Sequence, residues 1–322
     1  MKQRSAMIVA VLAMAWSGTL AADAPKFLVG VWYQPASGFD KWKARGINTL
    51  VGCPVGADNL SRSEWMEAAR KAGLYYIAKP TDDPEELKAD LLDQNLIAWE
   101  QPDEPDAGGN VPPAKIIENY KAWKAIGPKP VLLNLDGWKT QYRATADYLQ
   151  YVQGADWIAF DYYIINRGEG PSNINRLGER LDKLKQWTGG KKKLFVFIEC
   201  SDQDLRVSDW GQTADASGKK LAPLMRGPTP EEMTKEIEVS MAHGASGIIY
   251  FPDVIGKGWQ SFDGTTPEVE ATMKLANEKL AAAADKSPRG NPAIARPVDP
   301  KAPLDGTDVT IGGVTYTLKK KQ

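Results

Sequence analysis

Cysteine and histidine are scarce in this chain. Its 322 residues include two cysteines, Cys53 and Cys200, and one histidine, His243. Two cysteines cannot make a disulfide framework, and a chain of this length does not need one to build its core. A single histidine also cannot supply the several imidazole ligands of a typical zinc site. The sequence therefore does not indicate a disulfide-stapled fold or a histidine-rich metal site.

An excess of charge of either sign is also missing. The chain has 40 lysines and arginines against 41 aspartates and glutamates, a formal net charge of −1. A nucleic-acid or anionic-membrane partner needs a strong basic excess. We therefore expect neither partner, and the 43% hydrophobic and 25% charged residues are typical of a globular protein.

Long hydrophobic runs are absent after the first residues. Lys2 and Arg4 precede an apolar run over residues 6–16, and small residues surround Ala22. This pattern predicts a signal peptide over residues 1–22. The run is too short to span a bilayer, and no stop-transfer segment follows it. We expect an exported protein, periplasmic or extracellular, without a membrane span.

From residue 26 onward, one phrase recurs eight times: a short β-branched or aromatic run, a turn-rich stretch, and an amphipathic helical segment. The expected strands are residues 27–33, 48–53, 74–79, 96–100, 131–135, 157–163, 194–199 and 247–251. The expected helices are residues 39–45, 61–72, 84–93, 113–126, 139–152, 173–187, 230–243 and 266–284. Several strands are almost continuously apolar, as in parallel sheets that are covered on both faces.

Eight such units over residues 25–284 predict an α/β fold, a (β/α)8 TIM barrel. A doubly wound open sheet is the alternative, but no glycine-rich dinucleotide or phosphate-binding motif follows the first strand. In a barrel, His243 ends the seventh helix, away from the functional face, so a Ser-His-Asp triad has no histidine to use. Cys53 and Cys200 would lie on strands that two others separate, and we do not expect them to pair.

The C-terminal part changes character. Residues 285–306 carry five prolines without a helical or strand period, which predicts a linker or a strap along the barrel. In residues 307–322, alternating apolar residues flank Gly312 and Gly313, which predicts a short β-hairpin.

Function in such a barrel lies at the C-terminal ends of the strands. Two carboxylates stand there: Glu104, just beyond the fourth strand, and Glu199, the last residue of the seventh. Glycoside hydrolysis with retention needs two carboxyl groups about 5–5.5 Å apart, across the bond to be cut. Residues on strands four and seven face each other across the barrel mouth. The alternative for each glutamate is a structural ion pair inside the barrel.

The segment WEQPDEP, residues 99–105, resembles the WELxNEP segment that ends the fourth strand in clan A glycoside hydrolases. This resemblance implies a retaining mechanism with Glu104 as the acid/base and Glu199 as the nucleophile. Tyr162 or Tyr163 is similar in position to the hydroxyl that hydrogen-bonds the nucleophile in this clan. The chain departs from the pattern at Asp103, where the family has an asparagine that contacts the sugar 2-hydroxyl.

Other side chains expected near the strand ends are polar groups or aromatics that could stack on sugar rings. The candidate substrate-binding residues are Trp32, Tyr33, Asp103, Asn134, Asp136, Trp138, Asp161, Tyr162, Tyr163, Trp210 and Trp259. Packing in the core is the alternative for the aromatics. No metal or other cofactor is expected.

The sequence thus predicts a retaining glycoside hydrolase acting on a glycan or oligosaccharide through a two-carboxylate double displacement. Two alternatives stay open. One is a carbohydrate-binding barrel without turnover, which the aspartate at residue 103 favours. The other is a transglycosidase that uses the same residues. The long segment over residues 201–227, which contains Trp210, is expected to shape the cleft.

Overall fold

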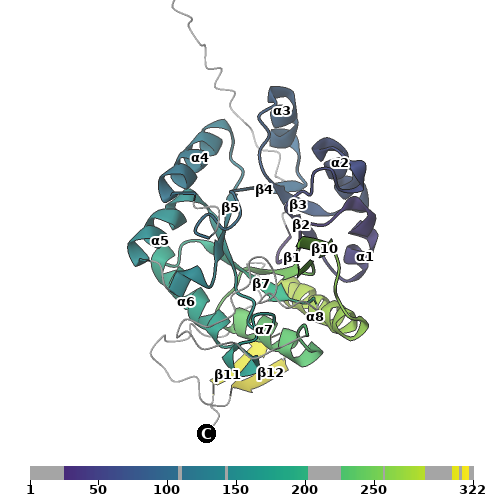
Figure 1. The fold of residues 1–322 in the computed structure, drawn as a ribbon, viewed down its shortest axis with the longest axis vertical. Coiled ribbons are helices and arrows are strands. Elements are labelled where there is room, and N and C mark those ends of the chain that lie inside the picture. The colour runs from purple at the N-terminus through teal and green to yellow at the C-terminus, as the bar shows by residue number, and fades with distance from the viewer. Residues whose placement is uncertain are drawn as a thin grey trace, which may run out of the picture.

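The computed structural model describes residues 25–107, 111–141, 144–201, 226–256, 258–286, 307–311 and 314–318. Within them, eight parallel strands close into a barrel in sequence order, because β8 pairs with β1 (Figure 1). The strands are β1 (Leu28–Trp32), β2 (Thr49–Val51), β3 (Tyr75–Ala78), β4 (Leu96–Glu100), β5 (Val131–Asp136), β6 (Trp157–Asp161), β7 (Lys193–Glu199) and β8 (Gly247–Phe251). The predicted (β/α)8 barrel is confirmed.

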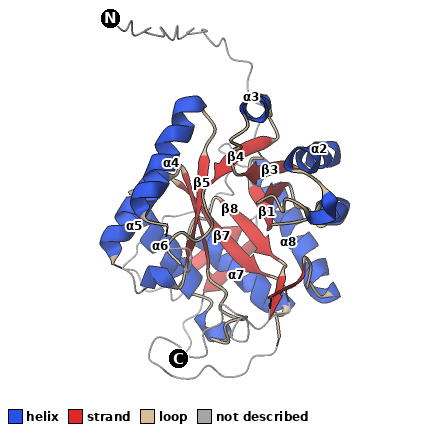
Figure 2. Ribbon diagram, turned by 45° about the horizontal axis from the view of Figure 1, so that its top comes forward, coloured by secondary structure: helices blue, strands red, loops and turns tan. Residues whose placement is uncertain are grey.

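Eight α-helices follow the strands and cover the outside of the barrel (Figure 2). They are α1 (Phe39–Ala44), α2 (Arg62–Ala72), α3 (Pro84–Leu92), α4 (Pro113–Ile126), α5 (Thr145–Tyr151), α6 (Arg176–Thr188), α7 (Pro230–Ala242) and α8 (Pro267–Lys286). Short 3-10 segments are η1 (Ala36–Gly38), η2 (Ala57–Asn59), η3 (Lys139–Gln141), η4 (Val152–Gly154) and η5 (Pro171–Asn173). The helix predicted over residues 139–152 is thus divided into η3, α5 and the start of η4.

Local signals in the sequence set several helix ends. Ser61 accepts a hydrogen bond from the Glu64 amide while the Glu64 side chain accepts one from the Ser61 amide, a capping box that starts α2. Thr229 and Glu232 start α7 in the same way. Gly73 ends α2 with φ +68, a left-handed conformation that favours glycine.

The apolar residues form two layers because side chains alternate along each strand. The inner cluster fills the barrel and includes Trp157, Phe195 and Phe197. The outer cluster lies between strands and helices and includes Trp42 and Trp65, which are 0% and 1% exposed. A well-packed barrel thereby leaves the strand ends to carry polar groups.

Beyond β8, the antiparallel strands β9 (Val254–Gly256) and β10 (Gly258–Ser261) form a small sheet that the sequence pattern did not predict. The predicted C-terminal hairpin is present as β11 (Thr307–Ile311) and β12 (Val314–Leu318), which pair antiparallel. The predicted signal peptide lies outside the described residues, as does the predicted linker after Lys286, where α8 ends.

Both cysteines are free, as expected from their strands. Among the helices of the described residues, none has the length and apolar composition required to cross a membrane.

Candidate active site

A cavity of about 500 Å³ opens at the C-terminal ends of β1 to β4. Its lining combines aromatic, basic and acidic side chains: Trp32, Tyr33, Cys53, Val55, Arg62, Lys79, Pro80, Thr81, Glu100 and Asp103. Of the predicted substrate-binding residues, Trp32, Tyr33 and Asp103 are in this lining. Its size and its mixed lining suit a small ligand such as a few sugar rings.

Two residues beside the cavity have a left-handed backbone. Tyr33 follows β1 with φ +49, and Glu104 lies beyond β4 with φ +38. Residues other than glycine rarely adopt positive φ, and such conformations are concentrated at functional sites. This backbone strain therefore occurs at two residues that follow barrel strands at the mouth of the barrel.

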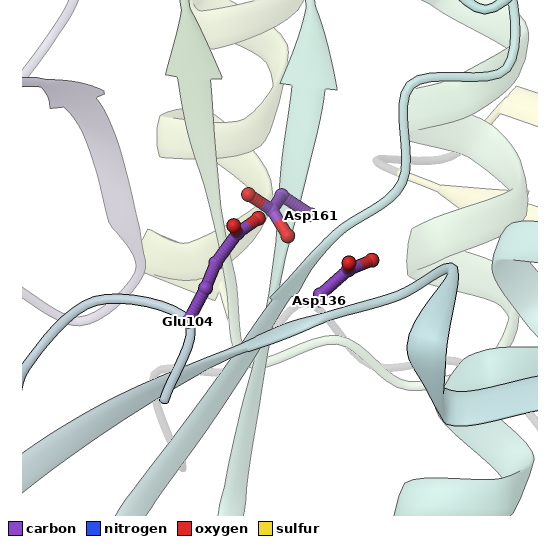
Figure 3. Close-up of side chains that lie close together, drawn as sticks. All are labelled: Glu104, Asp136 and Asp161. Carbon is purple, nitrogen blue, oxygen red and sulfur yellow. The ribbon is translucent and has the colours of Figure 1, made fainter. Parts of the chain in front are cut away.

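The carboxyl groups of Glu104, Asp136 and Asp161 lie close together (Figure 3), and Glu104 follows Asp103 of the cavity lining in the chain. One oxygen each from Glu104, Asp136 and Asp161 lies within 4.8 Å of the others. Asp136 and Asp161 end the neighbouring strands β5 and β6 and are partners in register. Glu104 reaches the pair from the segment after β4, and its carboxyl group hydrogen-bonds that of Asp161.

Burial and the repulsion between neighbouring carboxylates raise the pKa values of Glu104 and Asp161. Burial raises the pKa of Glu104 well above its ordinary value, and the negative charges of Asp161, Asp103 and Asp136 raise it further. Burial also raises the pKa of Asp161 to about 7, although the hydrogen bond from Glu104 opposes this shift. The hydrogen bond between them raises the pKa of Glu104 and lowers that of Asp161, so Glu104 is its donor and Asp161 its acceptor.

Buried polar contacts fix the strand ends below the carboxyl groups. Asp106, which is 2% exposed, accepts hydrogen bonds from the Asp136 amide at 3.0 Å and from the Tyr148 hydroxyl at 2.8 Å. The Gly137 amide donates to the Asp161 carbonyl at 2.8 Å. These bonds hold the segment after β4 and the ends of β5 and β6 in one arrangement.

Asp103 connects the cavity to the three carboxyl groups. Its side chain is accessible from the cavity, and Asn134 on β5 donates a hydrogen bond to it at 3.0 Å. Desolvation by the surrounding protein raises the pKa of the Asp103 carboxyl group. The hydrogen bond from Asn134 and the positive charge of Lys79 lower it. Next to it, burial and the Asp103 charge raise the pKa of Glu100 to about 8.

The two predicted tyrosines after β6 point to different places. Tyr163 belongs to the inner cluster, and its hydroxyl lies 3.4 Å from an Asp161 oxygen, so it reaches the carboxyl group. Tyr162 belongs to the outer cluster and donates to Glu169. Trp138 packs against Tyr162 with ring centroids 6.2 Å apart and is 5% exposed. The structure therefore does not bring Tyr162 or Trp138 to the cavity.

Glu199 lies in a different environment from Glu104. It is 0% exposed, and its two oxygens accept hydrogen bonds from the amides of Ile165 at 2.8 Å and Asn166 at 2.6 Å. Glu236 of α7 hydrogen-bonds the same carboxyl group. Burial raises the pKa of Glu199 to about 7 against these hydrogen bonds. The groups that most raise the pKa of Glu104 are Asp161, Asp103 and Asp136, and Glu199 is not among them.

Trp210 lies outside the described residues, and so does the side chain of Trp259. Among the site residues missing from the predicted set are Lys79, Arg62 and Glu100 in the cavity lining, and Glu236 beside Glu199. Lys79 follows β3, so its position at a strand end was a usable signal. Glu236 gave no such signal, because it lies inside a helix.

The cluster of Glu104, Asp136 and Asp161 also has the chemistry of a cation site. Carboxylate oxygens are the ligands that hard cations such as Ca²⁺ and Mg²⁺ prefer. The same three groups can instead share a proton, which is the arrangement of the Glu104–Asp161 hydrogen bond. The absence of a metal stays a prediction from the sequence.

No family model matches this chain, and no curated protein matches it in sequence. Solved structures do match its fold. One is a β-1,3-glucanosyltransferase from Rhizomucor miehei, solved as an active-site mutant with laminaritriose. It shares 12% identity over 76% of this chain and 97% of its own, with a TM-score of 0.50.

Two further solved structures match this chain with lower TM-scores. An endo-1,4-β-D-mannanase from Thermotoga petrophila is 13% identical over 78% of this chain and 99% of its own, with a TM-score of 0.49. An endo-β-1,3-glucanase of glycoside hydrolase family 128 from Amycolatopsis mediterranei has the same identity and coverages, with a TM-score of 0.46. At 12% identity, the likeness to the glucanosyltransferase shows the fold alone, and chemistry must be argued from the side chains.

The side chains offer one clear chemical capacity. Glu104 has a raised pKa, adjoins Asp103 of the cavity lining in the chain and has Asp161 as a partner that can take up or return charge. A carboxylic acid with a raised pKa is the group that general acid catalysis requires near neutrality. Aromatic rings in the same lining supply apolar faces for a ligand.

Proposed function

We propose that the protein is a retaining glycoside hydrolase that acts on a glycan or oligosaccharide, with Glu104 as its acid/base residue. The observation that carries the proposal is Glu104 itself: a strained residue just beyond a barrel strand, whose pKa is raised by burial and by its carboxylate neighbours. Trp32 and Tyr33 in the adjacent cavity supply faces on which sugar rings can stack. No cofactor takes part.

In the first step, Glu104 gives its proton to the glycosidic oxygen as the bond from that oxygen to the anomeric carbon breaks. A carboxylate forms a new bond to the anomeric carbon and yields a covalent glycosyl-enzyme. In the second step, water attacks the anomeric carbon while Glu104 takes its proton. The bond between the anomeric carbon and the carboxylate breaks in the same displacement, and the sugar is released with its original configuration.

Glu199 is the residue that we assign as the nucleophile. Its carboxyl group is enclosed by the Ile165 and Asn166 amides and by Glu236 when no substrate is bound. Attack therefore requires the segment after Tyr163 to release at least one of its oxygens when the glycan enters. This requirement makes the assignment directly testable.

A second candidate is a carbohydrate-binding barrel without turnover. The enclosure of Glu199 favours it, because a binding protein can keep this residue as a structural group. A transglycosidase would use the same catalytic residues and differ in the acceptor that resolves the intermediate. For each of these functions we propose that the protein is exported, because residues 1–22 have the pattern of a signal peptide.

The test compares the wild type, Glu199→Gly and Glu104→Gly on aryl glycosides and on β-glucan, mannan, xylan and galactan oligosaccharides, with and without azide. For a retaining enzyme, azide should rescue Glu199→Gly as the inverted glycosyl azide and Glu104→Gly as the retained one. Rescue of Glu104→Gly alone would indicate that a residue other than Glu199 is the nucleophile. Glycan binding without turnover in every variant would favour the binding barrel.

A further inference from the structure

The mouth of the barrel carries more acidic side chains than the two that a double displacement uses. Glu100, Asp103, Glu104, Asp136 and Asp161 lie close enough that the charges of some raise the pKa of others. Two basic residues act on the same set: Lys79 on Glu100 and Asp103, and Arg167 on Asp161. Arg62 also lines the cavity but is paired with Asp90 of α3. Five acidic groups against Lys79 and Arg167 therefore leave an excess of negative charge as the protons are lost.

Buried acceptor atoms around this mouth have no hydrogen-bond partner within the described part of the chain. They are Glu100 Oε1, Asn134 Oδ1 and Asp253 Oδ2, from residues that are at most 6% exposed. Glu100 is part of the cavity lining, so a ligand in the cavity would come close to its carboxyl group. Unpaired buried acceptors cost free energy until a donor reaches them. The site thus calls for a ligand that is rich in donors.

The sugar hydroxyls of a neutral glycan donate hydrogen bonds but leave the excess charge uncompensated. An ammonium group provides three N–H donors and a positive charge in one group. It satisfies acceptors and carboxylates together, and it does so in a partly enclosed space where charge pairs are poorly screened. The accessible carboxyl group of Asp103, which lies between Glu100 and the three-carboxyl cluster, is the expected contact.

We propose that the glycan bound in this cavity contains amino sugar residues with free, protonated amino groups. This inference rests on the proposed function and names the substrate class of the same site. Lys79 opposes an ammonium at its own end of the cavity, so the amino group is expected on the side of Asp103 toward Glu104.

The test is a comparison of three tetrasaccharides with one backbone: cello-, chito- and chitosan-oligosaccharides, which carry a hydroxyl, an acetamido group or a free amine. Isothermal titration calorimetry of full-length Glu104→Gln at pH 7.5 measures binding without turnover, and wild-type hydrolysis is measured in parallel. Glucosamine, galactosamine and mannosamine are compared with their parent hexoses as competitors, which removes dependence on linkage. We expect the amine ligands to bind about tenfold more tightly or better, equivalent to about 1.4 kcal/mol, and the preference to shrink with added salt.

Asp103→Asn in the same background should reduce the preference for the amine to less than about threefold, equivalent to roughly 0.65 kcal/mol. Glu85→Gln, which removes an exposed acid of α3, should leave the preference intact. Equal binding of the neutral ligands, or no binding of any sugar, overturns the inference. Binding of Ca²⁺ or Mg²⁺ alone, lost in Asp161→Asn, also overturns it and assigns the acids to a metal. An amine preference in binding without hydrolysis of any glycan defeats the proposed function only.

Discussion

The carboxyl group of Glu104 hydrogen-bonds the carboxyl group of Asp161, its neighbour from β6. One proton between two acids is stable only where water is largely excluded and no cation replaces it. The pair therefore shares a proton at the barrel mouth. Its value for catalysis depends on Asp161 keeping a negative charge next to Glu104.

Removal of that charge should change the pH dependence of hydrolysis. Burial and the Asp161 charge raise the pKa of Glu104, and Glu104 must be protonated to act. Activity is therefore lost as pH rises through its pKa. Asp161→Asn should lower that pKa and move the basic limb of kcat/KM to lower pH by about one unit or more. An unmoved limb in the full pH profile, with Glu85→Gln as the matched control, would show that another residue is the acid.

Glu104→Gln should affect substrates according to their leaving groups. General acid catalysis contributes about 10²–10⁴-fold to rate, and leaving groups that need no proton do not benefit from it. We expect kcat/KM to fall by about that factor on natural oligosaccharides and much less on dinitrophenyl glycosides. Equal losses on both substrates, measured at the same pH, would indicate damage to the site instead of loss of a proton donor.

Trp32 is expected to contribute binding without affecting the chemical step. Its ring lies in the cavity lining and packs edge-on against Phe197, with centroids 5.5 Å apart. Trp32→Ala should raise KM about tenfold with little change in kcat, because stacking acts equally on the ground state and the transition state. Trp32→Phe keeps an aromatic face and should recover part of the affinity. A loss confined to kcat would contradict a role in stacking.

The fold could be predicted from the sequence because its signals are local and repeated. The apolar run of β8, the capping boxes at Ser61 and Thr229, and the glycine that ends α2 each act over a few residues. Glu104 could also be found, since its position after β4 follows from counting strands. The strands β9 and β10 could not be predicted, because they are too short to give a periodic signal.

Side-chain direction explains the positions that sequence analysis did not place. Tyr162 follows Asp161, which faces the barrel mouth, and alternation turns Tyr162 toward the helices. This difference was readable from the strand period. The enclosure of Glu199 was not, because it depends on Glu236, 37 residues away, and on the amides after Tyr163. Long-range contacts of this kind leave no local pattern.

Gly137 is expected to be intolerant of any side chain. A Cβ at this position would lie 2.6 Å from the Asp161 carbonyl oxygen and 2.7 Å from the Tyr162 Cβ. Backbone atoms cannot move aside cheaply, so Gly137→Ala should cost about 1–3 kcal/mol in the free energy of unfolding. It should also lower kcat, since Asp136 and Asp161 would separate. Denaturant unfolding and kinetics check both effects, and a variant with unchanged stability would refute the close packing.

The buried pair of Glu199 and Glu236 should make the protein less stable as pH rises. Burial raises the pKa of both carboxyl groups, that of Glu199 to about 7, whereas unfolded glutamate has a pKa of about 4.3. Between these values the folded state binds more protons than the unfolded one. The stability that is present below about pH 4 is therefore lost as pH rises toward about 7.

Glu236→Gln should reduce this loss. The amide of glutamine can still donate a hydrogen bond to Glu199 but cannot ionise, so the repulsion that accompanies loss of the shared proton disappears. We expect the decline in unfolding free energy between pH 5 and 8 to shrink by about 1–2 kcal/mol, at about 1.36 kcal/mol per pKa unit. Calorimetric Tm values for the wild type, Glu236→Gln and Glu85→Gln measure it, at about 2–4 °C per kcal/mol. Parallel pH profiles in all three proteins would mean that the pair ionises without cost and that Glu199 is already a free carboxylate at neutral pH.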